Sequence, residues 1–201
     1  MWGGIPLLTS PQRGGKTGTE IHSKIRSREA EIQAIETVLK LARKNPQTHI
    51  HLCHVSAQES IELLEKYALK NVTAEVSIHH LFLNESAYPF LQNFVKVNPP
   101  LRTKEDNLAL MEALKKGTIQ SIATDHAPHT QAEKEQDYWQ APSGMPMIEL
   151  TLPLLLSEFD RGSLTLEEIS KWTSQNPAQI FGIKNKGEIK IARAYHEKAL
   201  K

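Results

Sequence analysis

The sequence predicts an α/β protein built on parallel strands. Segments 48–56, 72–79 and 118–125 have the apolar or alternating character of strands, and helical segments lie between them at 56–69 and 103–116. Strands that alternate with helices along a chain usually form a parallel sheet covered by helices. The chain has 201 residues, of which 39% are hydrophobic, and this is enough for one such core.

Capping residues mark the ends of the helices between these strands. Ser56 and Glu59 have the spacing of a capping box, which predicts a helix that begins there. Thr103 and Asp106 can cap the next helix in the same way, and Gly117 follows its last turn. Both helices therefore have start signals that come from local sequence alone.

The remaining segments are assigned by periodicity and composition. Apolar residues at helical spacing predict a helix over 27–44, which an Asn-Pro pair ends. The first 25 residues are rich in Gly, Ser, Thr and Pro and are expected to be loop. Towards the other end, an apolar stretch covers 148–156, and further helices are expected near 165–174 and 177–181.

Composition excludes several classes of partner. The net charge is +1, with 24 basic and 23 acidic residues, so nothing favours binding to nucleic acid or to an anionic membrane. No apolar run approaches the roughly 20 residues of a membrane span. The single cysteine, Cys53, cannot form a disulfide within the chain. We expect a cytoplasmic protein, for which a small anionic substrate remains possible.

Two strand ends carry candidate metal ligands. Asp125, in the segment TDHAPH, ends the third predicted strand, and His54, in HLCHVS, ends the first. A carboxylate and an imidazole at the same edge of a sheet suit zinc, although a catalytic zinc normally takes about three protein ligands. The alternatives are a capped strand end beside surface histidines for Asp125, and a hydrogen-bonded core position for His54.

A proline-rich segment and a histidine pair complete the set. In VNPPLR, Asn98 offers an amide, and Arg102 offers a fork for either a ligand carboxylate or an acidic side chain. A rigid surface loop is the alternative for this segment. His79 and His80 end the second predicted strand, where neighbours point to opposite faces, so a structural role is favoured for them.

Taken together, these segments resemble one enzyme family. HLCHVS, TAEVSIHHL, KVNPPLR, ATDHAPH, a following Glu-Lys pair and NPAQIFG are similar in order and spacing to dihydroorotases of the allantoinase-like branch, over roughly residues 20–189. The resemblance implies part of a distorted (β/α)8 TIM-type barrel with the N-terminal strands missing, because a complete barrel needs roughly 250 residues. It also implies a zinc-dependent cyclic amidohydrolase of pyrimidine biosynthesis, which interconverts dihydroorotate and N-carbamoyl-aspartate.

The same resemblance assigns roles to residues. His54 and Asp125 correspond to metal ligands, and Asp125 also corresponds to the catalytic base. Asn98 and His129 correspond to substrate-binding positions. In APSGMP, Pro142 and Gly144 correspond to the loop that contacts the substrate ring.

The sequence also departs from this family. The His-x-His-x-Arg segment of the first barrel strand has no match, so only two residues of the binuclear metal site are assigned. We expect a loop-rich segment at 1–26, the barrel part at 27–183, and an altered tail at 184–201 in place of a small β domain. A gene fragment, a frameshift product or half of a split enzyme would have this form.

Three readings of the function follow. The first is a dihydroorotase-like chain that has little activity alone and forms a homo-oligomer or pairs with a chain that supplies the missing strands. The second is a relative of allantoinase or dihydropyrimidinase. The third is a non-catalytic subunit that binds aspartate transcarbamoylase.

Overall fold

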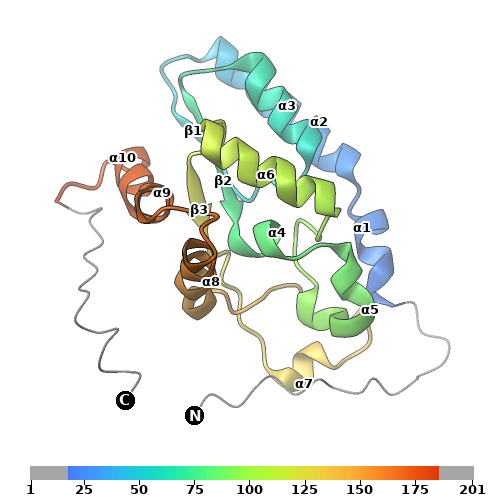
Figure 1. Ribbon diagram of the computed structural model, residues 1–201. Coiled ribbons are helices and arrows are strands. Elements are labelled where there is room, and N and C mark those ends of the chain that lie inside the picture. The colour runs from blue at the N-terminus through green and yellow to red at the C-terminus, as the bar shows by residue number, and fades with distance from the viewer. Residues whose placement is uncertain (1–17, 186–201) are drawn as a thin grey trace, which may run out of the picture.

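The structure is a computed structural model that describes residues 18–185. It contains a parallel sheet of β1 (Ile50–Leu52), β2 (Val72–Ser77) and β3 (Ser121–Ala123), in the order β1-β2-β3 (Figure 1). The predicted class, α/β with parallel strands, is confirmed. Each strand is shorter than its predicted segment: β1 and β3 keep only the middle of theirs, and β2 ends two residues before its predicted end.

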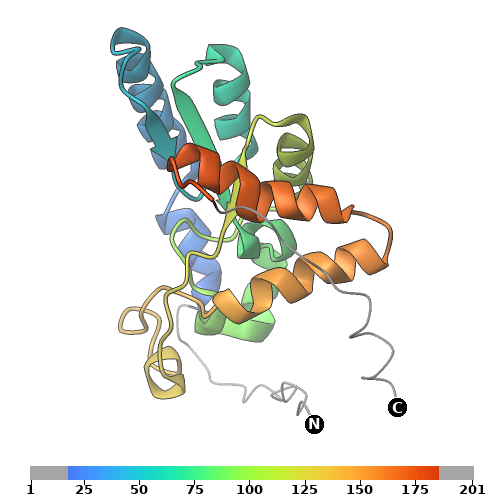
Figure 2. The same ribbon diagram turned by 90° about the vertical axis from the view of Figure 1, so that its left-hand side faces the viewer.

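Helices lie on both sides of this sheet. On one side are α2 (Arg28–Lys44), α3 (Gln58–Tyr67) and α6 (Lys104–Lys116), as Figure 1 shows. Across the other side run α9 (Leu166–Ser170), the π-helical turn η4 (Lys171–Gln175) and α10 (Asn176–Ile180), as Figure 2 shows. The main core joins both groups of helices to the strands, and its most buried members include Leu39, Ala74, Val76, Leu110, Ile119, Leu155 and Trp172.

One of the two predicted capping boxes is confirmed and the other is wrong. At α6, the Thr103 and Asp106 side chains cap each other's backbone, and Gly117 ends the helix in the left-handed conformation. At α3, the N-cap is Ala57 and no side chain of its own caps it. The predicted cap, Ser56, instead donates its hydroxyl to Glu31 of α2. A tertiary contact has thus replaced a local one.

The chain after β2 also differs from the prediction. Residues Ile78–Phe82 form a short helix, α4, so His79 and His80 do not lie on a strand. The prediction that they point to opposite faces of a strand was therefore wrong. Both are buried, and their rings lie 4.4 Å apart.

Short helical turns fill the segments between these elements. They are η1 (Thr19–Ile21), α1 (His22–Ile25), η2 (Glu85–Ala87), α5 (Tyr88–Leu91), η3 (Gln92–Val95) and α7 (Gln131–Lys134). The expectation of loop is thus wrong for 19–25. His22 in this segment is buried, and its ring lies 2.8 Å from both the Val97 carbonyl oxygen and the Tyr138 hydroxyl. These contacts with distant segments hold the helical turns in place. Residues 1–17 and most of the tail at 184–201 lie outside the described residues.

Part of the apolar surface of this fold has no cover. Helix α8 (Ile148–Asp160) exposes Ile148, Leu150 and Leu152, and β1 and β3 each have one neighbour only within the described sheet. Between residues 18 and 185, no helix has both the length and the apolar character that crossing a membrane requires.

Candidate metal and substrate site

His54 and Asp125 occupy equivalent positions on the outer strands. Each follows the last residue of its strand, β1 or β3, by one intervening residue. Each also has a left-handed backbone, with φ of 42° at His54 and 46° at Asp125. Residues other than glycine adopt this conformation at a cost of about 1–3 kcal/mol, and such residues cluster at functional sites. Both strands are therefore followed, at the same position, by a residue with an unfavourable positive φ.

His79 lies near Asp125 and within electrostatic range of His54. Its Nε2 is 4.0 Å from Asp125 Oδ2, and the charge on His54 contributes to lowering its pKa. The His79 side chain is fully buried, and neither ring nitrogen has a hydrogen-bond partner among the described residues. Burial, together with the neighbouring His80 and His54, lowers the pKa of His79 to about 2, so its ring is neutral.

His80 has a structural role that the His79 ring does not share. Its Nε2 lies 3.1 Å from the Pro99 carbonyl oxygen, within the proline segment that carries Asn98. Burial lowers the pKa of His80 to about 4, against the hydrogen bond to Pro99, which raises it. His80 therefore joins α4 to the segment on which a predicted substrate residue lies.

The predicted substrate residues meet in one region. Asn98 is exposed, two residues after Lys96, whose carbonyl oxygen accepts a 2.8 Å bond from the Gly144 amide. The His129 Nε2 lies 3.2 Å from the Ser143 carbonyl oxygen, next to the half-buried Pro142. Three segments that are distant in sequence are thus brought side by side just beyond Asp125.

Gly144 makes this approach possible. Its φ is 143°, and a Cβ placed there would lie 2.6 Å from the Ala127 side chain and 3.0 Å from His129 Nε2. No L side chain fits both the backbone conformation and the space. Glycine at this position lets the 142–144 backbone pack directly against the chain that follows Asp125.

Arg102 is bound within the chain. Its guanidinium donates to Ser56 Oγ at 3.1 Å and to the Arg26 carbonyl oxygen at 2.9 Å, and it lies 3.2 Å from Glu31 Oε2. Of the two predicted partners for the Arg102 guanidinium, a ligand carboxylate or an acidic side chain, the structure shows the acidic side chain. Burial raises the pKa of Glu31, but bonds from Ser56, Ser60 and Ala57 outweigh it and keep the carboxylate charged.

The donor types at the strand ends suit zinc, but their number is small. An imidazole and a carboxylate are common zinc ligands, and a catalytic site takes about three from the protein. Among residues 18–185, no group of three or more His, Cys, Asp or Glu side chains is arranged to hold a metal.

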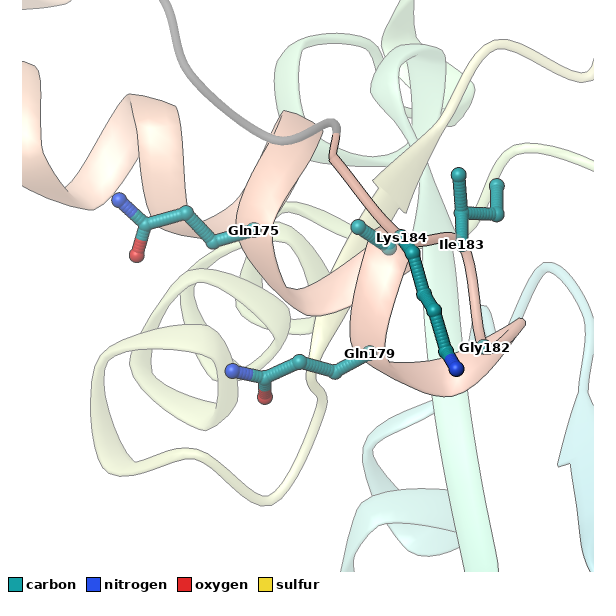
Figure 3. Close-up of a pocket in the computed structure, with 6 residues that line it drawn as sticks. Gln175, Gln179, Gly182, Ile183 and Lys184 are labelled. Atoms are coloured by element: carbon teal, nitrogen blue, oxygen red, sulfur yellow. The ribbon is translucent and has the colours of Figure 1, made fainter.

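Sequence reasoning missed several residues of this region. Lys96 and Lys134 are buried beside the 138–144 segment, and Tyr138 and His22 are hydrogen-bonded to each other there. The only signal for Lys134 was the Glu-Lys pair of the family resemblance. Figure 3 shows a separate pocket at the end of η4, α10 and the residues that follow, lined by Gln175, Gln179 and Lys184 among others, and none of the candidate residues lines it.

In barrel enzymes too, functional side chains lie beyond the carboxyl ends of parallel strands. A sequence profile of the amidohydrolase family matches residues 17–193, and the chain belongs to this family. Its curated relatives include dihydroorotases. One from Halobacterium salinarum is 40% identical over 178 residues, which cover 89% of this chain and 41% of the relative. Another, from Bacillus caldolyticus, is 47% identical over 139 residues, covering 68% and 33%.

Solved structures agree on the fold. A dihydropyrimidinase from Brevibacillus agri matches with a TM-score of 0.77 at 26% identity, covering 87% of this chain and 40% of that one. A dihydroorotase from Saccharomyces cerevisiae in complex with 5-fluoroorotic acid matches with a TM-score of 0.69 at 22% identity, covering 80% and 45%. The chain spans about two fifths of the length of the curated relatives named above, or less.

Proposed function

We propose that this chain forms the part of a dihydroorotase-like cyclic amidohydrolase that contains His54 and Asp125 of a zinc site. The observation that carries the proposal is the matched pair His54 and Asp125, which follow β1 and β3 at the same position with positive φ, with the buried His79 4.0 Å from Asp125. The dihydroorotase relatives support the choice of dihydroorotate and N-carbamoyl-aspartate as substrates. The three strands would then be consecutive strands of a (β/α)8 barrel, and the protein would act in the cytoplasm.

In this proposal each residue has a stated task. When bound, zinc supplies a Lewis acid that polarises an amide carbonyl and makes water more acidic. The Asp125 carboxylate accepts a proton from the water that adds to the amide carbonyl, and delivers it to the ring nitrogen that leaves as the C–N bond breaks. Asn98 and His129 hold the ring, and the backbone at Pro142 and Gly144 packs against it, so that the carbonyl stays in line for attack.

The open edges of the fold support a proposal about partners. Unpaired parallel strands and exposed apolar side chains on α8 are unusual on an isolated domain. We propose that another set of barrel strands, from a complementing chain or a homo-oligomer, covers them and supplies the missing zinc ligands. Without these strands, the chain is expected to bind zinc weakly and to turn over little substrate.

Zinc titration of the purified chain tests this assignment. We expect a zinc Kd weaker than about 1 μM, because two ligands are fewer than a catalytic site uses. His54→Ala and Asp125→Asn should each weaken binding further, whereas His49→Ala, at an exposed histidine next to β1, should not. Stoichiometric tight zinc together with normal turnover would contradict the incomplete site, and binding that ignores both replacements would contradict the ligand assignment.

The dihydropyrimidinase structure favours one second candidate. Its likeness at 26% identity fits a relative that opens a neutral cyclic amide instead of dihydroorotate. A substrate panel of dihydroorotate, dihydrouracil and hydantoin, assayed on the chain with its complementing strands, separates the two. Activity on the neutral rings alone would replace the first proposal with the second.

A further inference from the structure

Two buried lysines lie between the segments that carry the predicted substrate residues. The residues Lys96 and Lys134 are only 8% and 5% exposed. Lysine is almost never buried to this degree unless its ammonium group has partners, because removing the charge from water is costly. No ion pair between either lysine and a carboxylate occurs within the part of the chain that the structure describes.

Backbone carbonyls take the place of carboxylates around both ammonium groups. Lys96 Nζ donates to the carbonyl oxygens of Tyr138 and Ala141, each at 2.6 Å, and lies 4.3 Å from the centre of the Tyr138 ring. Lys134 Nζ donates to the carbonyl oxygens of Pro142 and Gly144, at 3.0 and 2.9 Å. Four carbonyls from the seven residues 138–144 thus converge on two cations.

These bonds also connect the segment to the rest of the site. The Lys96 carbonyl oxygen accepts from the Gly144 amide at 2.8 Å and lies 3.4 Å from Lys134 Nζ. Because Lys96 is two residues before Asn98, the same contacts tie Asn98 to the 138–144 segment. His129, which approaches Ser143, is tied in on the other side.

A purely local loop would not need this arrangement. A segment of seven residues has few internal hydrogen bonds here, and the carbonyls that face inward have no other donors in this part of the structure. An ammonium group is suited to the task because it offers three donors from one point and its bonds are charge-assisted. Burial and the nearby Lys96 lower the pKa of Lys134 to about 8, so placing two cations together has a cost.

We propose that Lys96 and Lys134 are positioning residues, which hold residues 138–144 in the shape that presents the Pro142–Gly144 backbone to the substrate beside Asn98 and His129. This rests on the proposed function, since that function assigns these residues to the substrate. Neither lysine touches the reacting atoms. Their effect passes through the carbonyls they hold.

The test compares three lysine-to-methionine variants of the full chain. Lys96→Met and Lys134→Met keep an apolar stem of similar length and remove the donors. Lys115→Met is the matched control, because Lys115 also donates to a carbonyl, that of Ser163, but is exposed and far along the chain from the loop. Hydrogen exchange of peptides covering 138–145, 28–44 and 104–116 measures the loop and the core separately.

We expect exchange in 138–145 to accelerate about tenfold or more in each buried-lysine variant, with α2 and α6 unchanged, since losing a charged hydrogen bond corresponds to at least that factor. With zinc and the complementing strands present, the affinity for N-carbamoyl-aspartate should fall by about tenfold. Lys115→Met should change neither quantity.

The possible outcomes distinguish a failure of the positioning role from a failure of the proposed function. Unchanged loop exchange, acceleration across the whole chain, or a looser loop with unaltered affinity would each overturn the positioning role. If the unaltered chain binds no N-carbamoyl-aspartate with zinc and complementing strands present, the proposed function itself fails, and the positioning role falls with it. That result differs from a failure of the lysines alone, in which the unaltered chain still binds.

Discussion

Lowering the pH should destabilise this protein through two buried histidines. His79 and His80 are both almost fully buried, and their pKa values in the folded chain are about 2 and about 4. An unfolded histidine has a pKa of about 6.5. Because the folded pKa is the lower one, the stability these groups contribute is present above about pH 6.5 and is lost as the pH falls.

The size of the loss follows from these values. Between about pH 7.5 and about pH 5, the unfolded state takes up nearly one proton for each histidine, while both stay neutral in the fold. At about 1.36 kcal/mol for each unit of pH, integration gives about 2 kcal/mol for each histidine, or about 4 kcal/mol together. This is a large fraction of the 5–15 kcal/mol typical of a domain.

Urea unfolding at these two pH values measures the effect, with a chelator present so that zinc does not contribute. Fluorescence of the buried Trp172 reports the core. The double variant His79→Leu, His80→Gln should lose most of the pH dependence, whereas His49→Gln, at an exposed histidine, should keep it. The two histidines do not have this effect if the wild-type protein loses less than about 1 kcal/mol of unfolding free energy between these pH values, or if the double variant shows the same pH dependence.

Two further replacements probe the site's framework. Gly144→Ala should cost more than about 2 kcal/mol, because its φ and the 2.6 Å approach to Ala127 both oppose a Cβ, whereas Gly162→Ala, with open space, should cost about 1 kcal/mol. Comparable costs would contradict the close approach. Arg102→Met should cost about 3–5 kcal/mol, since it leaves Glu31 buried without its cation. Arg161→Met, at an exposed pair, should stay within about 0.5 kcal/mol, and an equally small effect at Arg102 would contradict a structural role.

Local sequence was sufficient for some features of this protein. The capping box at Thr103 and the Gly117 stop act within a few residues, and the helix they bound is found where they predict it. The alternation of strands and helices predicted a parallel α/β sheet, because parallel strands need a long crossover connection, which is usually a helix. His54 and Asp125 could be assigned to strand ends because the strands before them were predicted.

Other features depended on contacts between distant segments. Ser56 has the right spacing for a local cap, but Glu31 of α2 binds its hydroxyl. The residues after Ser77 form a helix in which His79 is buried next to Asp125, although the alternating pattern favoured a longer strand. Sequence spacing cannot rank such alternatives, because the deciding partner lies on another element.

Patterns along the chain were enough to assign the class of fold, the family resemblance and the residue types that could carry the chemistry. The bonds of Arg102 to Glu31, and of Lys96 and Lys134 to four carbonyls of one segment, became visible only in the folded chain. The physical reason is that a buried charge is tolerated only where partners surround it, and those partners come from segments that meet after folding.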